Sequence, residues 1–72
     1  MEEAKEVGRF ARYLIESQPE GAYLFVWETK ESSFPEQDHL LDSVEDAKAV
    51  AWEDFGVPLT AWLPWEGGSL VG

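Results

Sequence analysis

One short segment of this sequence carries ligand chemistry for a metal ion. It combines three carboxylates with the single histidine of the chain: Glu36, Asp38, His39 and Asp42. Carboxylate oxygens and an imidazole nitrogen are donors that divalent cations accept. The spacing does not match an EF-hand loop, which needs a glycine at its bend and a glutamate at its twelfth position. Two interpretations stay open: a solvated acidic connector, which we favour, or a divalent-metal site.

The sequence offers few candidates for catalytic residues. The chain contains no cysteine, and its serines stand in no motif that places a nucleophile beside a base. No glycine-rich loop follows a strand and opens a helix, as phosphate-binding loops do. Acid–base work by two carboxylates needs a desolvated pocket, and a chain of 72 residues offers little room for one. We therefore expect a protein that is not an enzyme and that uses no cofactor.

The four tryptophans point instead to binding of a protein partner. A core this small cannot comfortably bury all of them, and tryptophan is enriched among the residues that dominate binding energy. Two interpretations stay open: the rings cap the core of a small domain, or they form an acid-rimmed aromatic patch for a basic protein or a second copy. The predicted patch consists of Trp52, Trp62, Trp65, Glu53 and Asp54.

Acidic residues dominate the charge. Fifteen Asp and Glu oppose five Lys and Arg, giving a formal net charge of −10. Acids and bases cancel within residues 1–12, so this net charge lies on the rest of the chain. Binding to nucleic acid or to anionic membranes needs clustered Lys and Arg, so we expect neither partner. A basic partner, a cation or simple solubility remain as explanations.

The segment pattern predicts one cytoplasmic domain. No apolar run approaches the roughly 20 residues that span a bilayer, and the acidic N-terminus lacks the features of a secretory signal. The hydrophobic share of 44% and aromatic share of 14% are typical of a folded chain. We expect a single domain over residues 1–66 and a flexible tail over residues 67–72.

Residues 43–55 are predicted to form the main helix. Ser43 is a good N-cap, and Asp46 approximates a capping box. The apolar face repeats in steps of three and four residues: Val44, Ala47, Ala51 and Phe55. Gly56 and Pro58 mark the end of the helix.

The strands are less certain from pattern alone. Residues 21–30 are rich in aromatic and β-branched side chains and predict a strand. Residues 3–17 fit either an amphipathic helix or, as we favour, a short turn followed by a strand over residues 9–17. Residues 39–41 can add an edge strand, and the apolar segment 59–65 is expected to pack over the sheet edge. The expected fold is two-layer α+β, with two to three antiparallel strands against one helix.

Four short stretches between residues 10 and 56 follow one another in a recognisable order. They are Arg12-Tyr13-Leu14-Ile15-Glu16, Glu20-Gly21-Ala22-Tyr23, Pro35-Glu36 and Ser43-Val44-Glu45-Asp46-Ala47. This order resembles the HicB-like antitoxin core, and it is similar to the layout of many small uncharacterised bacterial α+β proteins. The glycine–cysteine pair usual after the Pro-acid stretch is absent, and no DNA-binding helix-turn-helix or ribbon follows Phe55. The resemblance implies a partner-binding domain rather than a repressor.

The sequence therefore predicts a non-enzymatic, acidic protein-interaction module. It would bind and neutralise a basic partner, as antitoxin and immunity proteins do, with its negative surface speeding encounter. Two alternatives stay open: a small protein that binds a divalent metal through residues 36–42, and a structural homo-oligomer.

Overall fold

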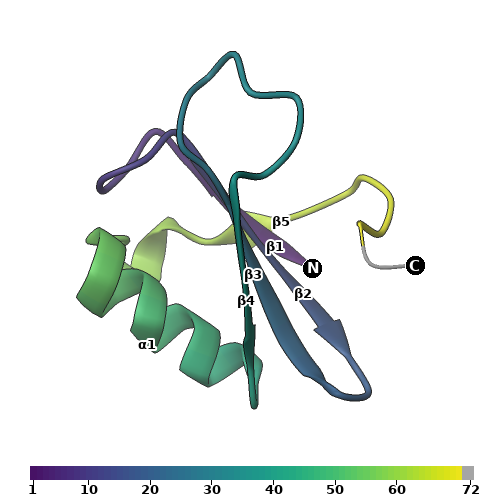
Figure 1. Cartoon of the computed structure of the whole chain (residues 1–72). Coiled ribbons are helices and arrows are strands. Elements are labelled where there is room, and N and C mark those ends of the chain that lie inside the picture. The colour runs from purple at the N-terminus through teal and green to yellow at the C-terminus, as the bar shows by residue number, and fades with distance from the viewer. Residues whose placement is uncertain (71–72) are drawn as a thin grey trace.

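A computed structural model describes residues 1–70 and shows one antiparallel sheet with a helix against one face (Figure 1). In chain order the elements are β1 (Glu2–Lys5), β2 (Arg12–Gln18), β3 (Gly21–Trp27), β4 (Gln37–Leu41), α1 (Val44–Phe55), the 3-10 turn η1 (Leu59–Ala61) and β5 (Leu63–Pro64). The five strands lie in the order β4-β3-β2-β1-β5. The α+β class is confirmed, but the expected two to three strands undercount the sheet.

The N-terminal segment is two strands joined by a turn. β1 pairs antiparallel with β2, and its one buried residue, Ala4, lies opposite Tyr13. The chain reverses through two left-handed residues, Glu6 at φ 57° and Gly8 at φ 64°. A Cβ at Gly8 would lie 2.2 Å from the carbonyl oxygen of Phe55, so only glycine fits there. The strand interpretation of this segment is confirmed; the helical alternative is wrong, and the first residues form a strand rather than a turn.

The ends of α1 follow the predicted signals. The hydroxyl oxygen of Ser43 accepts a hydrogen bond of 3.1 Å from the backbone N–H of Asp46. Gly56 adopts the left-handed conformation at φ 72°, and its N–H donates to the carbonyl of Trp52 at 3.1 Å. Between these caps, the apolar face of the helix packs on the sheet, and Ala47, Ala51 and Phe55 are buried there.

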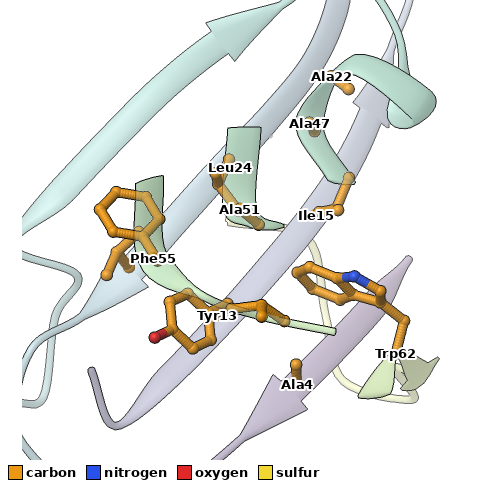
Figure 2. Close-up of a cluster of buried hydrophobic side chains, with 11 residues drawn as sticks. Ala4, Tyr13, Ile15, Ala22, Leu24, Ala47, Ala51, Phe55 and Trp62 are labelled. Carbon is orange, nitrogen blue, oxygen red and sulfur yellow. The ribbon is translucent and has the colours of Figure 1, made fainter. Parts of the chain in front are cut away.

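The main core lies between α1 and the sheet (Figure 2). Side chains of β2 and β3 alternate between the two sheet faces, and those facing the helix are apolar. They are Tyr13, Ile15, Ala22, Leu24 and Val26. Trp62, from the segment that follows α1, packs into the same cluster beside Ile15 and Ala4.

The opposite sheet face is also covered in part. Leu14, Phe25 and Trp27 form a second buried cluster there, with Tyr23 and Trp65 packed against it. The segment after β5 lies on this side of the sheet, away from α1 (Figure 1). This double burial explains the unbroken apolar run at the end of β3.

Glu16 ties the chain's last described residues to this second face. Its side chain is only 1% exposed and accepts hydrogen bonds from Ser69 Oγ and, at 2.7 Å, from the backbone N–H of Leu70. A third bond of 2.5 Å comes from Gln18 Nε2. The segment 67–72, expected as a tail, thus contacts the sheet through residues 69 and 70, and its residues 71–72 lie outside the described residues.

In the described part of the chain, no helix is both long enough and apolar enough to cross a membrane.

Candidate functional site

The four predicted metal ligands are not brought together. Asp38 and His39 are neighbours on β4, so their side chains leave opposite faces of the sheet. The His39 imidazole lies near Phe55 on the helix side, with Nε2 3.0 Å from Gln37 Oε1. Glu36 instead accepts a hydrogen bond of 3.2 Å from the backbone N–H of Glu28. Among residues 1–70, Asp42 included, no three His, Cys, Asp or Glu side chains gather as metal ligands would.

The predicted tryptophan patch is divided among three places. Trp62 is 9% exposed and belongs to the core under α1. Trp65 lies with the second cluster on the other sheet face, where its Nε1 donates to the carbonyl of Gly68 at 3.2 Å. Trp52 is 54% exposed on the outer side of α1. Only Trp52 and its acidic neighbours Glu53 and Asp54 remain together at the surface.

A groove lies beside Trp52, with a volume of about 370 Å³. Its lining comes from the outer side of α1 and from η1: Glu45, Lys48, Ala49, Trp52, Glu53 and Leu59. We call this site the Trp52 groove. Trp52 and Leu59, which is 63% exposed, give it an apolar surface, and the carboxylates of Glu45 and Glu53 supply negative charge.

The local structure explains how these residues meet. Glu45, Ala49 and Glu53 repeat every four residues, so they lie along one line of the helix surface. Leu59 joins them because the left-handed Gly56 ends α1 and the chain turns back into η1. Helical spacing could have identified the α1 residues from the sequence, but the turn that brings Leu59 alongside gave no such signal.

The charge of the groove is acidic. Its one cation, Lys48, is already paired, with Nζ 2.8 Å from Glu2 Oε1. Glu45, Glu53 and Asp54 form no ion pair with any residue in the range 1–70. A partner that enters the groove therefore meets uncompensated carboxylates beside an exposed indole.

Comparisons with known proteins return nothing that resembles this chain: no family model, no curated protein and no solved structure matches it.

Proposed function

We propose that this protein is a non-enzymatic interaction module that binds a basic segment of a partner protein in the Trp52 groove. The observation that carries the proposal is the exposed indole of Trp52, which lies in a groove whose carboxylates have no cation of their own. The occupant that fits is a segment with an apolar side chain to cover the indole and Lys or Arg to meet the carboxylates.

The apolar surface supports this proposal first. Trp52 and Leu59 expose more than half of their side chains although both are large and hydrophobic. Tryptophan supplies a large contact area with few rotatable bonds, which is why it dominates the binding energy of many interfaces. A partner side chain that covers these two residues would remove apolar surface from water at a site that already has a concave shape.

Charge supports it independently. α1 contains four acidic residues and one lysine, and the whole chain has a formal charge of −10. Such a field attracts a basic protein and raises its association rate. The same field repels nucleic acid and other polyanions, so the surface favours a cationic protein.

The placement of two acids also points to binding. Glu53 and Asp54 lie in the last turn of α1, where no basic residue is present. The negative end of the helix dipole disfavours carboxylates there, by about 0.3–1 kcal/mol each. Residues that break a local stability rule are found mainly at functional sites. The resemblance to the HicB-like antitoxin core implies a partner-binding domain, which is in line with this proposal.

The test is binding of a synthetic amphipathic peptide of lysine and leucine, measured by calorimetry at low and high salt. We expect salt-sensitive binding that Trp52→Ala weakens by roughly 30-fold, the effect of losing about 2 kcal/mol at a binding hot spot. Phe34→Ala is the matched control, because Phe34 is an aromatic residue that is 80% exposed and lies outside the groove. It should leave the affinity within about twofold, since an exposed side chain outside the contact adds little.

A second peptide, in which glutamate replaces lysine, distinguishes electrostatic attraction from non-specific apolar association. It should not bind. Equal losses in Trp52→Ala and Phe34→Ala would contradict the proposal. So would a chain that associates only with itself in sedimentation experiments, because that result would assign the groove to a structural homo-oligomer.

A further inference from the structure

Three of the chain's five cations gather around one pocket. The pocket has a volume of about 190 Å³ and lies where β1 and β3 end and β2 begins. Three basic residues, Lys5, Arg12 and Lys30, contribute to its lining, together with Glu6, Ala11, Trp27, Thr29 and Ser32. We call it the basic pocket. Three cations and one carboxylate give it a formal charge of +2, on a molecule whose net charge is −10.

Strand register builds one wall of the basic pocket. Arg12 on β2 pairs with Lys5 on β1 and with Trp27 on β3, so the three side chains form a row across neighbouring strands. Cross-strand partners share a face of the sheet. This face is the one opposite α1, because the neighbouring residues Ala4 and Tyr13 belong to the core beneath the helix. The basic pocket and the Trp52 groove therefore lie on different sides of the molecule.

Arg12 is held in place without an anionic partner. Its guanidinium carbon lies 4.1 Å from the centre of the Trp27 ring, a cation–π contact that fixes the planar group. Among residues 1–70 the guanidinium makes no ion pair and no hydrogen bond, although the chain has fifteen carboxylates. An arginine positioned in this way keeps its fork of N–H donors for a ligand.

A buried donor in the same wall is also unpaired. Trp27 is 4% exposed, and its indole Nε1 has no hydrogen-bond partner within the described residues. A buried N–H without an acceptor costs about 1–3 kcal/mol, so such groups call for an explanation. The indole Nε1 of Trp62 in the core beneath α1 is unpaired in the same way, so this N–H alone does not identify a ligand.

The loop after β3 supplies the other wall. Thr29 Oγ1 and Ser32 Oγ lie 2.8 Å apart and bring two hydroxyls to the pocket. Lys30 Nζ is 2.5 Å from Glu6 Oε1, and Lys5 Nζ is 3.9 Å from Glu3 Oε1. Both lysines are paired at exposed positions, where ion pairs contribute little and exchange partners readily.

We infer that the basic pocket binds the phosphate group of a small molecule. A planar guanidinium, two ammonium groups and two hydroxyls are the donors that recognise a tetrahedral dianion. The volume is below the roughly 300–1,000 Å³ of pockets for drug-sized ligands, so it suits the phosphate group itself rather than a large ligand. The acidic surface elsewhere disfavours a nucleic-acid strand.

Binding is tested with inorganic phosphate and with methyl phosphate, by following the four indole N–H signals in NMR spectra. Total ionic strength is held constant with potassium chloride, because any salt screens the repulsion within a chain of charge −10. We expect the Trp27 signal to shift with saturation, while that of Trp52 stays in place. Tighter binding of inorganic phosphate identifies free phosphate as the ligand class, and tighter binding of methyl phosphate identifies an ester.

Variants that remove one positive charge locate the site. Lys30→Gln should weaken binding at least tenfold, because it removes one ammonium donor from the basic pocket. Lys30 is exposed, so we expect the substitution to change stability little. Lys48→Gln is the matched control: it removes the same charge outside the basic pocket and should bind phosphate like the parent chain. Glu6→Gln should strengthen binding several-fold, because it frees Lys30 and removes the carboxylate from the lining.

Three results would overturn the inference. One is an equal loss in Lys30→Gln and Lys48→Gln, which would mean that only net charge matters. Another is an equal Trp27 shift with acetate at the same concentration and ionic strength. The third is the absence of any Trp27 shift with both phosphates. None of these results bears on the Trp52 groove, because that site is tested with a cationic peptide.

Discussion

Tyr13 shows how one polar atom can hold a turn against the core. Its hydroxyl accepts a hydrogen bond of 2.7 Å from the backbone N–H of Phe10 and donates one of 3.0 Å to the carbonyl of Val7. The ring itself is buried beneath α1, close to Phe55 (Figure 2). The turn between β1 and β2 therefore depends on a side chain that the sequence presents only as one more aromatic residue.

We predict that Tyr13→Phe lowers the free energy of unfolding at pH 7 by about 1–3 kcal/mol, because it leaves backbone groups of the turn unpaired. Burial also raises the pKa of Tyr13 above its ordinary value of 10.0. A raised pKa gives stability that is complete below pH 10.0 and is lost as pH rises through the folded-state value. Urea unfolding between neutral and alkaline pH should show a shallower alkaline loss in Tyr13→Phe than in the parent chain.

Tyr23→Phe is the control for this experiment. The pKa of Tyr23 is also raised, mainly by its hydrogen bond to the Glu20 side chain, but that pair is exposed to solvent. We expect its stability at pH 7 to change by less than about 0.5 kcal/mol, as for surface substitutions in general. An equal loss in both variants would contradict the role given to the Tyr13 hydroxyl.

Residue types predicted part of the candidate site. Trp52, Glu53 and Asp54 were identified from an aromatic residue beside acids, and the structure keeps them together at the surface. The same reasoning grouped Trp62 and Trp65 with them, yet these rings lie on opposite sides of the sheet. Their sides depend on where the chain turns after α1, and side-chain type does not encode that path.

At the scale of elements, α1 was predictable from both of its ends and from its apolar spacing, because these signals are local. β1 and β5 were not predicted as strands. β1 has one buried residue in four, and β5 has two residues, so neither shows an alternating pattern. Each exists through its pairing with a neighbour distant in sequence, as Glu2 does with both Ile15 and Pro64. Non-local pairing of this kind is what local pattern cannot reveal.

Substitutions at the two ends of α1 should affect stability and peptide binding differently. The double variant Glu53→Gln with Asp54→Asn removes carboxylates from the negative end of the helix dipole. At low salt, the free energy of unfolding of this variant should exceed that of the parent chain by about 0.5–2 kcal/mol. The variant should also bind the lysine–leucine peptide more weakly. Urea unfolding and calorimetry measure the two effects.

Glu45→Gln is the matched control at the opposite end of α1, where the dipole favours a carboxylate. It also removes charge from the Trp52 groove, so it should weaken peptide binding, but it should lower stability instead of raising it. A gain of stability in both variants would contradict the helix-dipole argument. Unchanged affinity in both would contradict the assignment of these acids to binding.

At the scale of the whole molecule, the large negative net charge opposes folding but favours association with a basic partner. The net charge of −10 repels itself within a chain whose strands and helix are packed together, and added salt screens that repulsion. We predict that stability rises when potassium chloride increases from about 0.02 M to about 0.5 M, a range in which the Debye length falls severalfold. Peptide binding should weaken over the same range, because the attraction between opposite charges is screened as well.

Thermal unfolding and calorimetry in the same buffers measure the two trends. Opposite signs are expected, with the melting temperature rising as the affinity falls. A peptide affinity that is independent of salt would mean that apolar contact alone drives binding, and the acids around Trp52 would then have no part in it.

The most direct measurement of the central claim is an NMR titration with the lysine–leucine peptide that follows the four indole N–H signals. The four tryptophans lie at different places: Trp52 lines the groove and Trp62 belongs to the core beneath α1. Trp27 lines the basic pocket and belongs to the second cluster, against which Trp65 packs. The account predicts that the Trp52 signal shifts to saturation while the other three stay in place. A shift confined to the other three signals, with Trp52 unchanged, would contradict it.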